Sequence, residues 1–175
     1  MTFTATVSAV APGAGTPTGT VTFRNNGASL GSGTLSGGVA TITVSSLTVA
    51  SHTITSTYNG DTNFNTNTGT MTGNPQVVNK ASTTTTITST TPSPYTHGTA
   101  LRVNFTVVAV APGVGTPTGT VTVTASTGQT YTASVATGHC NVTIPSAGNI
   151  TLTASYPGDT HFFSSTSVPY NQIVN

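Results

Sequence analysis

The amino-acid sequence predicts an all-β protein made of two tandem copies of one antiparallel β-sandwich. Three observations predict this fold: a Thr-rich composition with few helix formers, alternation of apolar and polar side chains, and an internal repeat. Thr accounts for 43 of the 175 residues, and its β-branched side chain favours pleated surfaces. Only 3% of the residues are charged, so Thr hydroxyls are expected to take the place of charge on the solvent-facing side of the strands.

The repeat is clearest in a segment that occurs twice, 100 residues apart. Residues 9–23 read AVAPGAGTPTGTVTF and residues 109–123 read AVAPGVGTPTGTVTV, with 13 of 15 positions identical. A second pair, YNGDTNF at 58–64 and YPGDTHF at 156–162, follows, and QVVN at 76–79 matches QIVN at 172–175. The sequence therefore predicts two domains, 1–80 and 81–175, joined around Asn79–Ser82.

Each copy is expected to form about seven short strands, as in other β-sandwiches. Apolar side chains alternate with polar ones, which places them on the inner face of a strand. Turn-forming pairs such as Asn26-Gly27 and Asn59-Gly60 separate the segments. In the first copy the inward positions are, in order, Phe3, Ala5 and Val7; Val21 and Phe23; Leu35; Ile42 and Val44; Ile54 and Tyr58; and Phe64.

The two copies differ at their beginnings. The segment ASTTTTITST at 81–90 predicts a first strand of the second copy, before a turn at Pro92–Pro94. The first copy has no counterpart, because Met1 already aligns with Leu101, so we expect it to lack its opening strand. Such a sandwich exposes a pairing edge. Either the chain is a fragment of a longer array, or another chain or repeat supplies the strand by β-augmentation.

The repeated residues carry a family resemblance. The segments GTPTGTVTF, LSGGVATITVSSL and SHTITSTYNGDTNF resemble the bacterial Ig-like domain repeats of large secreted and surface proteins, and the resemblance covers nearly the whole chain. It implies two tandem Ig-like β-sandwiches used outside the cell as spacer or adhesive modules. It implies no catalytic residues and no cofactor.

Charge and composition exclude several classes of function. A net charge of +1 gives no basic patch for nucleic acid, whose binding needs clustered Lys and Arg. The sequence contains no run of about 18 apolar residues, so no membrane span is predicted. A single cysteine excludes a disulfide within the chain.

The only carboxylate side chains, Asp61 and Asp159, occupy equivalent positions. Catalysis by paired carboxylates needs both groups at one site, so we expect no enzyme activity. A Gly–Asp pair after a strand-ending Tyr suits a tight turn. We therefore interpret six residues as structural turn residues: Tyr58, Gly60 and Asp61, and Tyr156, Gly158 and Asp159.

One segment resembles a calcium loop superficially. Asp61, Asn63 and Asn65 place oxygen-bearing side chains at alternate positions. Calcium sites usually gather several carboxylates among six to eight oxygen ligands. These three residues are the one metal candidate, and we expect at most weak binding.

The remaining candidates have structural interpretations. Tyr58 and Tyr156 could stack on carbohydrate, but their positions at strand ends favour a tyrosine-corner role. Cys140 follows His139, yet it aligns with Ala40 and is expected in the core. Lys80 lies at the junction and has no acid nearby in sequence, so we expect no isopeptide crosslink. Three N-x-T sequons are expected to face solvent: Asn104, Asn141 and Asn149.

The sequence therefore predicts a non-enzymatic stalk, spacer or matrix segment of an extracellular or surface protein of bacteria. Its expected partners are other Ig-like repeats of the same or a neighbouring chain, and a surface polysaccharide is a further candidate. Two alternatives stay open. One is a subunit of a self-assembling fibre completed by strand donation between chains, and the other is a carbohydrate- or surface-binding accessory module.

Overall fold

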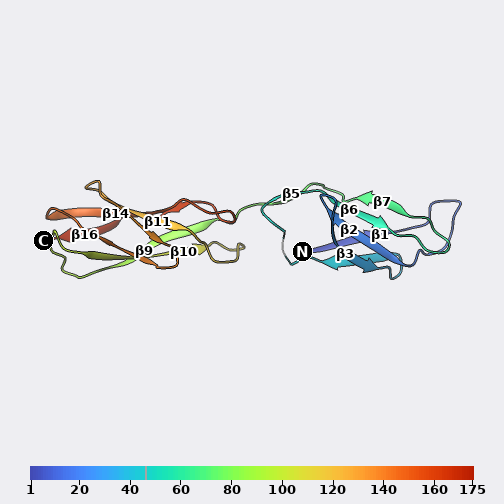
Figure 1. Cartoon of the computed structure of the whole chain (residues 1–175), viewed down its shortest axis with the longest axis horizontal. Helices are drawn as coiled ribbons and strands as arrows, with labels where there is room; N and C mark the ends of the chain where they lie inside the picture. Colours follow the sequence, from blue (N-terminus) through green and yellow to red (C-terminus); the bar gives the residue numbers. More distant parts are fainter. Residues whose placement is uncertain (46) are drawn as a thin grey trace. The chain divides into compact units, whose positions relative to one another are not determined.

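The computed structural model describes residues 1–45 and 47–175, and these residues form strands and loops with no helix (Figure 1). The chain divides into two compact units, Met1–Asn79 and Lys80–Asn175. Lys80 thus lies in the second unit, where its ammonium group donates a hydrogen bond to the backbone carbonyl of Asp159.

The described residues of the first unit, 1–45 and 47–79, form three antiparallel sheets. Strands β1 and β4 form one pair, β3-β2-β6-β7 form a four-stranded sheet, and β5 pairs with β8. The strands are β1 (Thr2–Thr6), β2 (Thr20–Asn25), β3 (Ala28–Thr34), β4 (Val39–Thr43), β5 (Ala50–His52), β6 (Ile54–Tyr58), β7 (Asn67–Thr70) and β8 (Gln76–Val78).

The second unit contains two antiparallel sheets. One has the order β13-β10-β9, and the other has the order β12-β11-β14-β15, with β16 also paired to β14. The strands are β9 (Thr83–Thr91), β10 (Leu101–Ala109), β11 (Thr120–Ala125), β12 (Thr130–Ser134), β13 (His139–Val142), β14 (Gly148–Tyr156), β15 (Ser165–Thr166) and β16 (Tyr170–Val174).

Each unit has its own hydrophobic core between its layers, built from the alternate apolar positions of the strands. The long repeated segment shows how the pattern works. Its Pro/Gly-rich half forms the turn before β2 or β11, and its second half opens that strand. Val21 and Phe23 are 1% exposed, and Val121 and Val123 are fully buried. The all-β fold of two tandem sandwiches predicted from the sequence is confirmed.

Phe64 departs from the expected strand alternation. It lies in the loop between β6 and β7, where it is partly buried against the first core. Its counterpart Phe162 is buried in the second unit. Both phenylalanines are held by a turn that begins at the preceding Asp, so their burial comes from loop geometry rather than from a pleated strand.

The opening strand distinguishes the units. In the second unit β9 pairs with one edge of β10 from Thr83 to Thr91, and β13 pairs with the other. In the first unit β1 takes the place of β10 and β4 that of β13, and within residues 1–45 and 47–79 no strand pairs with the second edge of β1. Within these residues the first sandwich shows no equivalent of β9, the opening strand of the second, as the sequence predicts.

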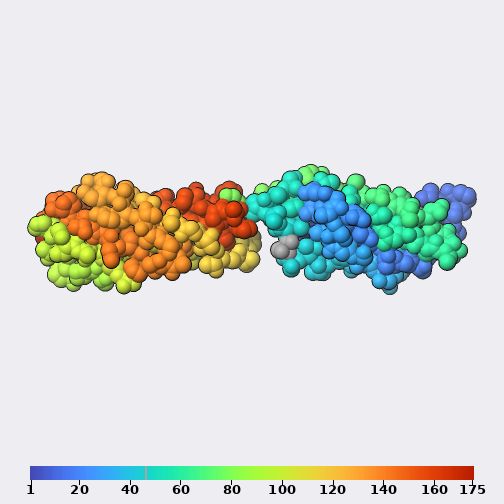
Figure 2. All heavy atoms as spheres, in the orientation of Figure 1, coloured from blue at the N-terminus to red at the C-terminus, as the bar shows by residue number. Residues whose placement is uncertain are grey.

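Residues before β10 close one end of the second unit. The Tyr95 ring is fully buried, and its backbone bridges to Val174 in β16. Figure 2 shows this yellow-green segment beside the orange and red C-terminal strands.

Candidate functional site

The most sequence-distinctive residues of each unit meet at a hydrogen-bonded turn. In the first unit Asp61 follows β6 and Gly60, and its carboxylate reaches Thr18, 43 residues earlier, in the repeated GTPTG segment. One carboxylate oxygen accepts hydrogen bonds from the Thr18 backbone N–H at 2.8 Å and from its hydroxyl at 2.7 Å. The other accepts from the backbone N–H groups of Asn63 and Phe64, both at 2.8 Å.

The second unit repeats this arrangement. Asp159 accepts from the backbone N–H and hydroxyl of Thr118 at 2.9 and 2.8 Å. Its other oxygen accepts from the N–H groups of His161 and Phe162 at 2.8 and 2.9 Å. We call these two arrangements the Asp–Thr ties. In the first unit the tie joins the loop before β2 to the loop after β6. In the second unit it joins the loop before β11 to the loop after β14.

The ties hold both carboxylates in the ionised form. Hydrogen bonds from the Thr18 hydroxyl and N–H, then from Asn63, lower the pKa of Asp61 well below its usual range. For Asp159, desolvation acts to raise the pKa, but hydrogen bonds from His161 and Thr118 outweigh it and lower the pKa well below normal. Because four donors already occupy its oxygens, each carboxylate has a structural role and is poorly placed to act as a general acid or base.

The glycine before each Asp is required by the turn. Gly60 and Gly158 have φ values of +82° and +88°, in the region that side chains disfavour. A Cβ at Gly158 would lie 2.7 Å from the carbonyl oxygen of Phe162, and one at Gly60 would lie 3.0 Å from that of Phe64. The turn thus needs glycine for its backbone angle and for the close approach of the returning chain.

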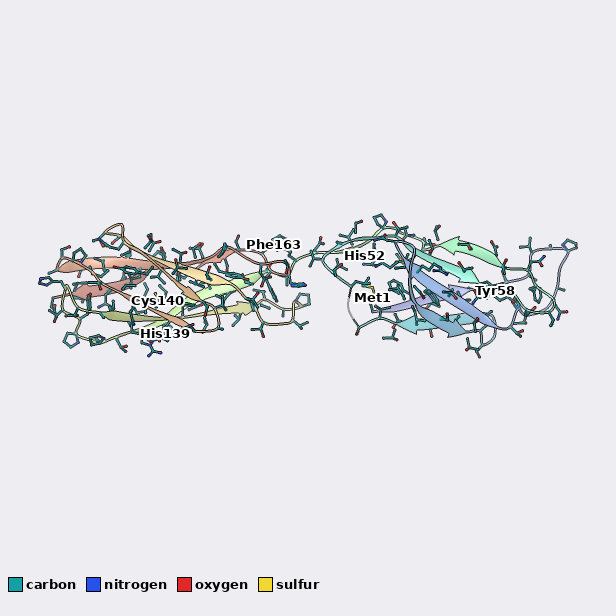
Figure 3. The ribbon with its side chains drawn as sticks, in the orientation of Figure 1. Met1, His52, Tyr58, His139, Cys140 and Phe163 are labelled. Carbon is teal, nitrogen blue, oxygen red and sulfur yellow. The ribbon has the colours of Figure 1, made fainter. Side chains whose placement is uncertain are left out.

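The tyrosines at the strand ends are buried. Tyr58 is 4% exposed and Tyr156 is fully buried (Tyr58 is labelled in Figure 3), so neither ring is available to stack on a sugar. Neither hydroxyl has a hydrogen-bond partner within 3.5 Å among the described residues, but both lie close enough to the tie for its carboxylates to act on their pKa values. Burial, with the charge of Asp159 nearby, raises the pKa of Tyr156 to about 12, and burial and Asp61 likewise raise the pKa of Tyr58.

Cys140 is a core residue. It lies on β13 opposite Val103 and is 6% exposed (Figure 3), and burial raises the pKa of its thiol to about 11. His139 contacts Arg102 and the Thr137 carbonyl rather than the thiol. The pair therefore lacks the activated thiolate that a nucleophile needs.

The sequon residues are not equally placed. Asn141 and Asn149 are exposed. Asn104 is half-buried, with its amide donating to the Ser89 hydroxyl at 3.0 Å and its carbonyl accepting from Arg102 at 3.1 Å. Asn104 lies between the buried Val103 and Phe105, on the outward side of β10, but it is only partly exposed, because β9 lies alongside β10 and a bulge beside Asn104 shifts the register there.

His52 is one of the buried polar residues that sequence reasoning missed. Its side chain is 3% exposed. Nδ1 of the ring lies within hydrogen-bond distance of the Asn25 side-chain amide, and Nε2 lies 2.9 Å from the Thr48 carbonyl oxygen. Because a carbonyl only accepts, Nε2 carries the proton and Nδ1 accepts from the Asn25 amide at 3.0 Å. His52 therefore links the end of β2 to the loop before β5.

The structure places the calcium candidates in and beside the first Asp–Thr tie. Both oxygens of Asp61 are engaged in the tie, and Asn63 and Asn65 are exposed. Across the described part of the chain, no three His, Cys, Asp or Glu side chains gather where they could hold a metal ion. The same residues include no helix with the length and apolarity to cross a membrane.

Comparison with known proteins gives a family and two similar structures. The family model described as bacterial Ig-like domain (group 3) matches residues 1–88 and 85–175. No curated protein sequence matches the chain. Fibronectin(III)-like modules of CbhA from Clostridium thermocellum are similar at 16% identity, with a TM-score of 0.41, over 99% of this chain and 83% of that one.

A second similar structure comes from a 1.5-MDa bacterial ice-binding adhesin and concerns its retention on the host cell surface. It shares 16% identity with a TM-score of 0.38, over 99% of this chain and 57% of that one. This chain therefore spans a little over half the length of the adhesin chain. Because the two matches of the family model together cover the whole chain, the protein belongs to the bacterial Ig-like domain (group 3) family, as two tandem domains.

Proposed function

We propose that this protein is a non-catalytic structural segment, a stalk, spacer or matrix element, of an extracellular or surface protein of bacteria. The observation that carries the proposal is the use made of the repeated residues. One shared Thr, Gly and Asp of each copy form an Asp–Thr tie and its turn, which join two loops of the same unit: Thr18, Gly60 and Asp61 in the first, and Thr118, Gly158 and Asp159 in the second. A residue engaged in this way stabilises a fold and is not available to a ligand.

Membership in the Ig-like family supports the same function, since such modules act by being folded and joined in series. The two units have separate cores, and a chain with 3% charged residues has little electrostatic means of attracting nucleic acid or charged substrates. The proposed location outside the cell rests on the family and not on any segment of this chain.

A carbohydrate- or surface-binding module stays a prediction, and a retention assay separates it from a spacer. The purified chain is incubated with insoluble polysaccharides and peptidoglycan, and bound and free protein are measured. A spacer stays in solution as an unrelated β-sandwich does. Saturable retention that is lost on changing the half-exposed Phe163 (52% exposed) to Ala contradicts the spacer function.

A self-assembling fibre is tested by sedimentation of the chain at increasing concentration. A spacer sediments as a monomer throughout. Filaments that grow with concentration favour the fibre and contradict the spacer function.

A further inference from the structure

Four polar side chains gather on the outer face of the β13–β10 pair in the second unit. Arg102 and Asn104 alternate with buried residues along β10, and His139 and Asn141 alternate with buried residues along β13. The register pairs Arg102 with Asn141 and Asn104 with His139, so the four side chains are neighbours across the strands. In Figure 3 His139 lies at the outer side of this sheet, whereas Cys140 lies between the two sheets. We call these four residues, Arg102, Asn104, His139 and Asn141, the polar platform.

The platform depends on a strand register that differs between the two units. In the first unit the Val7 N–H donates to the Gly38 carbonyl. In the second unit the carbonyl of the equivalent Gly138 accepts instead from Phe105, which lies two positions earlier along its strand. Relative to the first unit, β13 is thus displaced by two residues along β10. A displacement of two keeps each side chain on its own face of the sheet but changes its neighbour across the strands, and this produces the two pairs of the platform.

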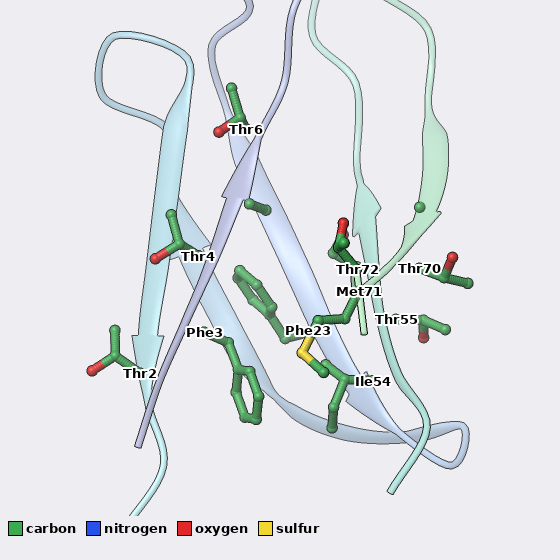
Figure 4. Close-up of a pocket in the computed structure, with 13 residues that line it drawn as sticks. Thr2, Phe3, Thr4, Thr6, Phe23, Ile54, Thr55, Thr70, Met71 and Thr72 are labelled. Atoms are coloured by element: carbon green, nitrogen blue, oxygen red, sulfur yellow. The ribbon is translucent and has the colours of Figure 1, made fainter. Parts of the chain in front are cut away.

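The equivalent face of the first unit carries different side chains. The positions that correspond to the platform hold Thr2, Thr4, Val39 and Thr41. Figure 4 shows Thr2 and Thr4 directed away from the core residues Phe3 and Phe23. At these positions the first unit therefore presents hydroxyl and apolar groups, whereas the second presents a guanidinium, an imidazole and two amides. Since the first sandwich folds with Thr and Val there, the shared fold does not require the platform.

Hydrogen bonds within the platform hold the guanidinium of Arg102 in place. Its Nε donates to the side-chain carbonyl of Asn104 at 3.1 Å, and its Nη2 lies 3.2 Å from Nδ1 of His139. The Asn104 amide donates in turn to the Ser89 hydroxyl at 3.0 Å, and His139 Nδ1 lies 3.0 Å from the Thr137 carbonyl. Nη1 has no partner among the described residues. The exposed Nη1–Nη2 edge is therefore left for a ligand, and two coplanar donor groups of this kind suit a carboxylate.

The positive charge of Arg102 is not balanced by a side chain of this chain. Both carboxylate side chains are engaged in the Asp–Thr ties. The other two basic side chains, Arg24 and Lys80, each donate to a backbone carbonyl of the same unit. The platform thus combines one fixed and exposed cation with uncharged polar groups, which complements a ligand that carries a negative charge among hydroxyl groups.

We propose that the polar platform is a binding site for an acidic sugar residue of a polysaccharide. The Nη1–Nη2 edge of Arg102 binds the carboxylate of the sugar. The exposed Asn141 amide, which pairs with Arg102 across the strands, donates to and accepts from the sugar hydroxyls. Nε2 of His139, which has no partner among the described residues, supplies a further polar contact. The platform lies on the open face of a sheet, across which an extended polysaccharide chain can lie.

The composition of the platform favours a carboxylate over a phosphate polymer. Nucleic acids bind to clusters of Lys and Arg, whereas the platform contains a single guanidinium. A carboxylate carries one charge on two coplanar oxygens, which one guanidinium can bind in full. The uncharged amide and imidazole groups then match the hydroxyl groups of a sugar.

An exposed contact of this kind is short in range and screened by salt. We expect a Kd of about 1–10 mM for a short acidic oligosaccharide, which a titration in solution detects and a retention assay does not. The platform would thus give the spacer a weak attachment point. This inference goes beyond the spacer function and stands without it.

The test is an NMR titration of the isotope-labelled full chain with trigalacturonate at low salt. Two ligands serve as controls: the same trisaccharide with its carboxylates methyl-esterified, and inorganic phosphate. The variants are Arg102→Gln, which removes the charge, and Arg102→Lys, which keeps the charge but not the two coplanar donors. Arg24→Gln is the matched control, because Arg24 is the other exposed arginine of the chain. Asn141→Ala tests the sugar contact separately.

Trigalacturonate is expected to shift the Arg102 Nε–H and Asn141 side-chain resonances saturably, and the methyl ester and phosphate are not. Arg102→Gln should raise the Kd at least about tenfold, and Arg102→Lys and Asn141→Ala should each raise it about threefold. Arg24→Gln should leave it unchanged. Binding should weaken as the salt concentration rises from about 20 to about 200 mM. The thermal unfolding midpoint of each variant, expected to stay within about 2 °C of that of the unmodified chain, shows that the fold is intact.

Three outcomes overturn the proposal. The first is the absence of saturable shifts at ligand concentrations about ten times the expected Kd. The second is binding that persists in Arg102→Gln or falls equally in Arg24→Gln, because the platform is then not the site. The third is equal binding of the methyl ester or of phosphate, because the platform then does not recognise the carboxylate of a sugar.

Discussion

Asp61 and Asp159 are the only carboxylate side chains in 175 residues, and each accepts hydrogen bonds from two donor groups of a distant Thr and two nearby amides. Their pKa values in the folded state are lowered, whereas an Asp in an unfolded chain titrates near about 4. The ionised form therefore stabilises the fold above the unfolded pKa. This stabilisation is lost as the pH falls through the folded pKa.

We therefore expect Asp61 and Asp159 to account for the loss of folding stability in acid. The free energy of unfolding, measured by urea titration followed by circular dichroism, is expected to fall between about pH 5 and pH 2. In the variant with Asp61→Asn and Asp159→Asn it should be lower at pH 7 and nearly flat over the acid range. The variant keeps the C-terminal carboxylate, which serves as the internal control. A wild-type profile that is flat from pH 5 to pH 2 would show that the ties contribute nothing.

Two tyrosines form a matched comparison in the second unit. The Tyr95 hydroxyl donates to the Thr99 carbonyl at 2.8 Å and accepts from the Ile144 N–H at 3.0 Å, whereas the buried Tyr156 hydroxyl has no such partner. Tyr95→Phe is expected to destabilise by about 1–2 kcal/mol, because it leaves a buried N–H unpaired, and Tyr156→Phe to change stability by less than about 0.5 kcal/mol. Thermal unfolding of the two variants measures the difference. Equal losses would mean that the Tyr156 hydroxyl is bonded in solution.

At the scale of elements, the turns that carry the ties depend on backbone geometry. Gly158 and Gly128 both have positive φ, +88° and +95°. A Cβ at Gly158 would meet the Phe162 carbonyl oxygen at 2.7 Å, while one at Gly128 would meet nothing within 4 Å. The pair therefore separates the cost of the backbone angle from the cost of the close contact.

Gly128→Ala is expected to destabilise by about 1–2 kcal/mol, the cost of a left-handed angle in a residue with a Cβ. Gly158→Ala should destabilise by about 3 kcal/mol or more, since the carbonyl must also move. Denaturant unfolding of both variants gives the two values. A Gly158→Ala variant no less stable than Gly128→Ala would contradict the close approach in the turn.

Much of the element structure could be predicted from the sequence. Alternation placed Val21 and Phe23 in the core. The offset of the repeat indicated that the described residues of the first unit include no strand equivalent to β9. The tie between Thr18 and Asp61 could not be predicted from spacing, because it joins loops 43 residues apart. A signal was present nonetheless: both residues recur together in the second copy, as Thr118 and Asp159.

Other details depend on packing that periodicity does not encode. The half-burial of Asn104 follows from the β9 strand beside it and the bulge in β10. The unbonded hydroxyls of Tyr58 and Tyr156 reflect the path of the loops around them. Period-two patterns give the face of a strand on which a side chain lies, but not what stands next to it.

At the scale of the whole molecule, the chain folds into two similar units, each with its own hydrophobic core. A spacer made of such units is expected to transmit force through its strands and to resist extension until a unit unfolds. Each unit should then refold alone, because its core, its tie and its turns are internal to it. Mechanical behaviour is therefore the property that the proposed spacer function requires.

Stretching single molecules of the full chain tests that function most directly. We expect two discrete unfolding steps, for chains whose extended lengths are roughly 28 nm for Met1–Asn79 and roughly 34 nm for Lys80–Asn175 at about 3.5 Å per residue, and both steps should return after relaxation. Asp159→Asn should lower the force of the longer step and leave the shorter one unchanged. A chain that extends smoothly without steps, or that fails to refold when the force is released, would contradict a mechanical role.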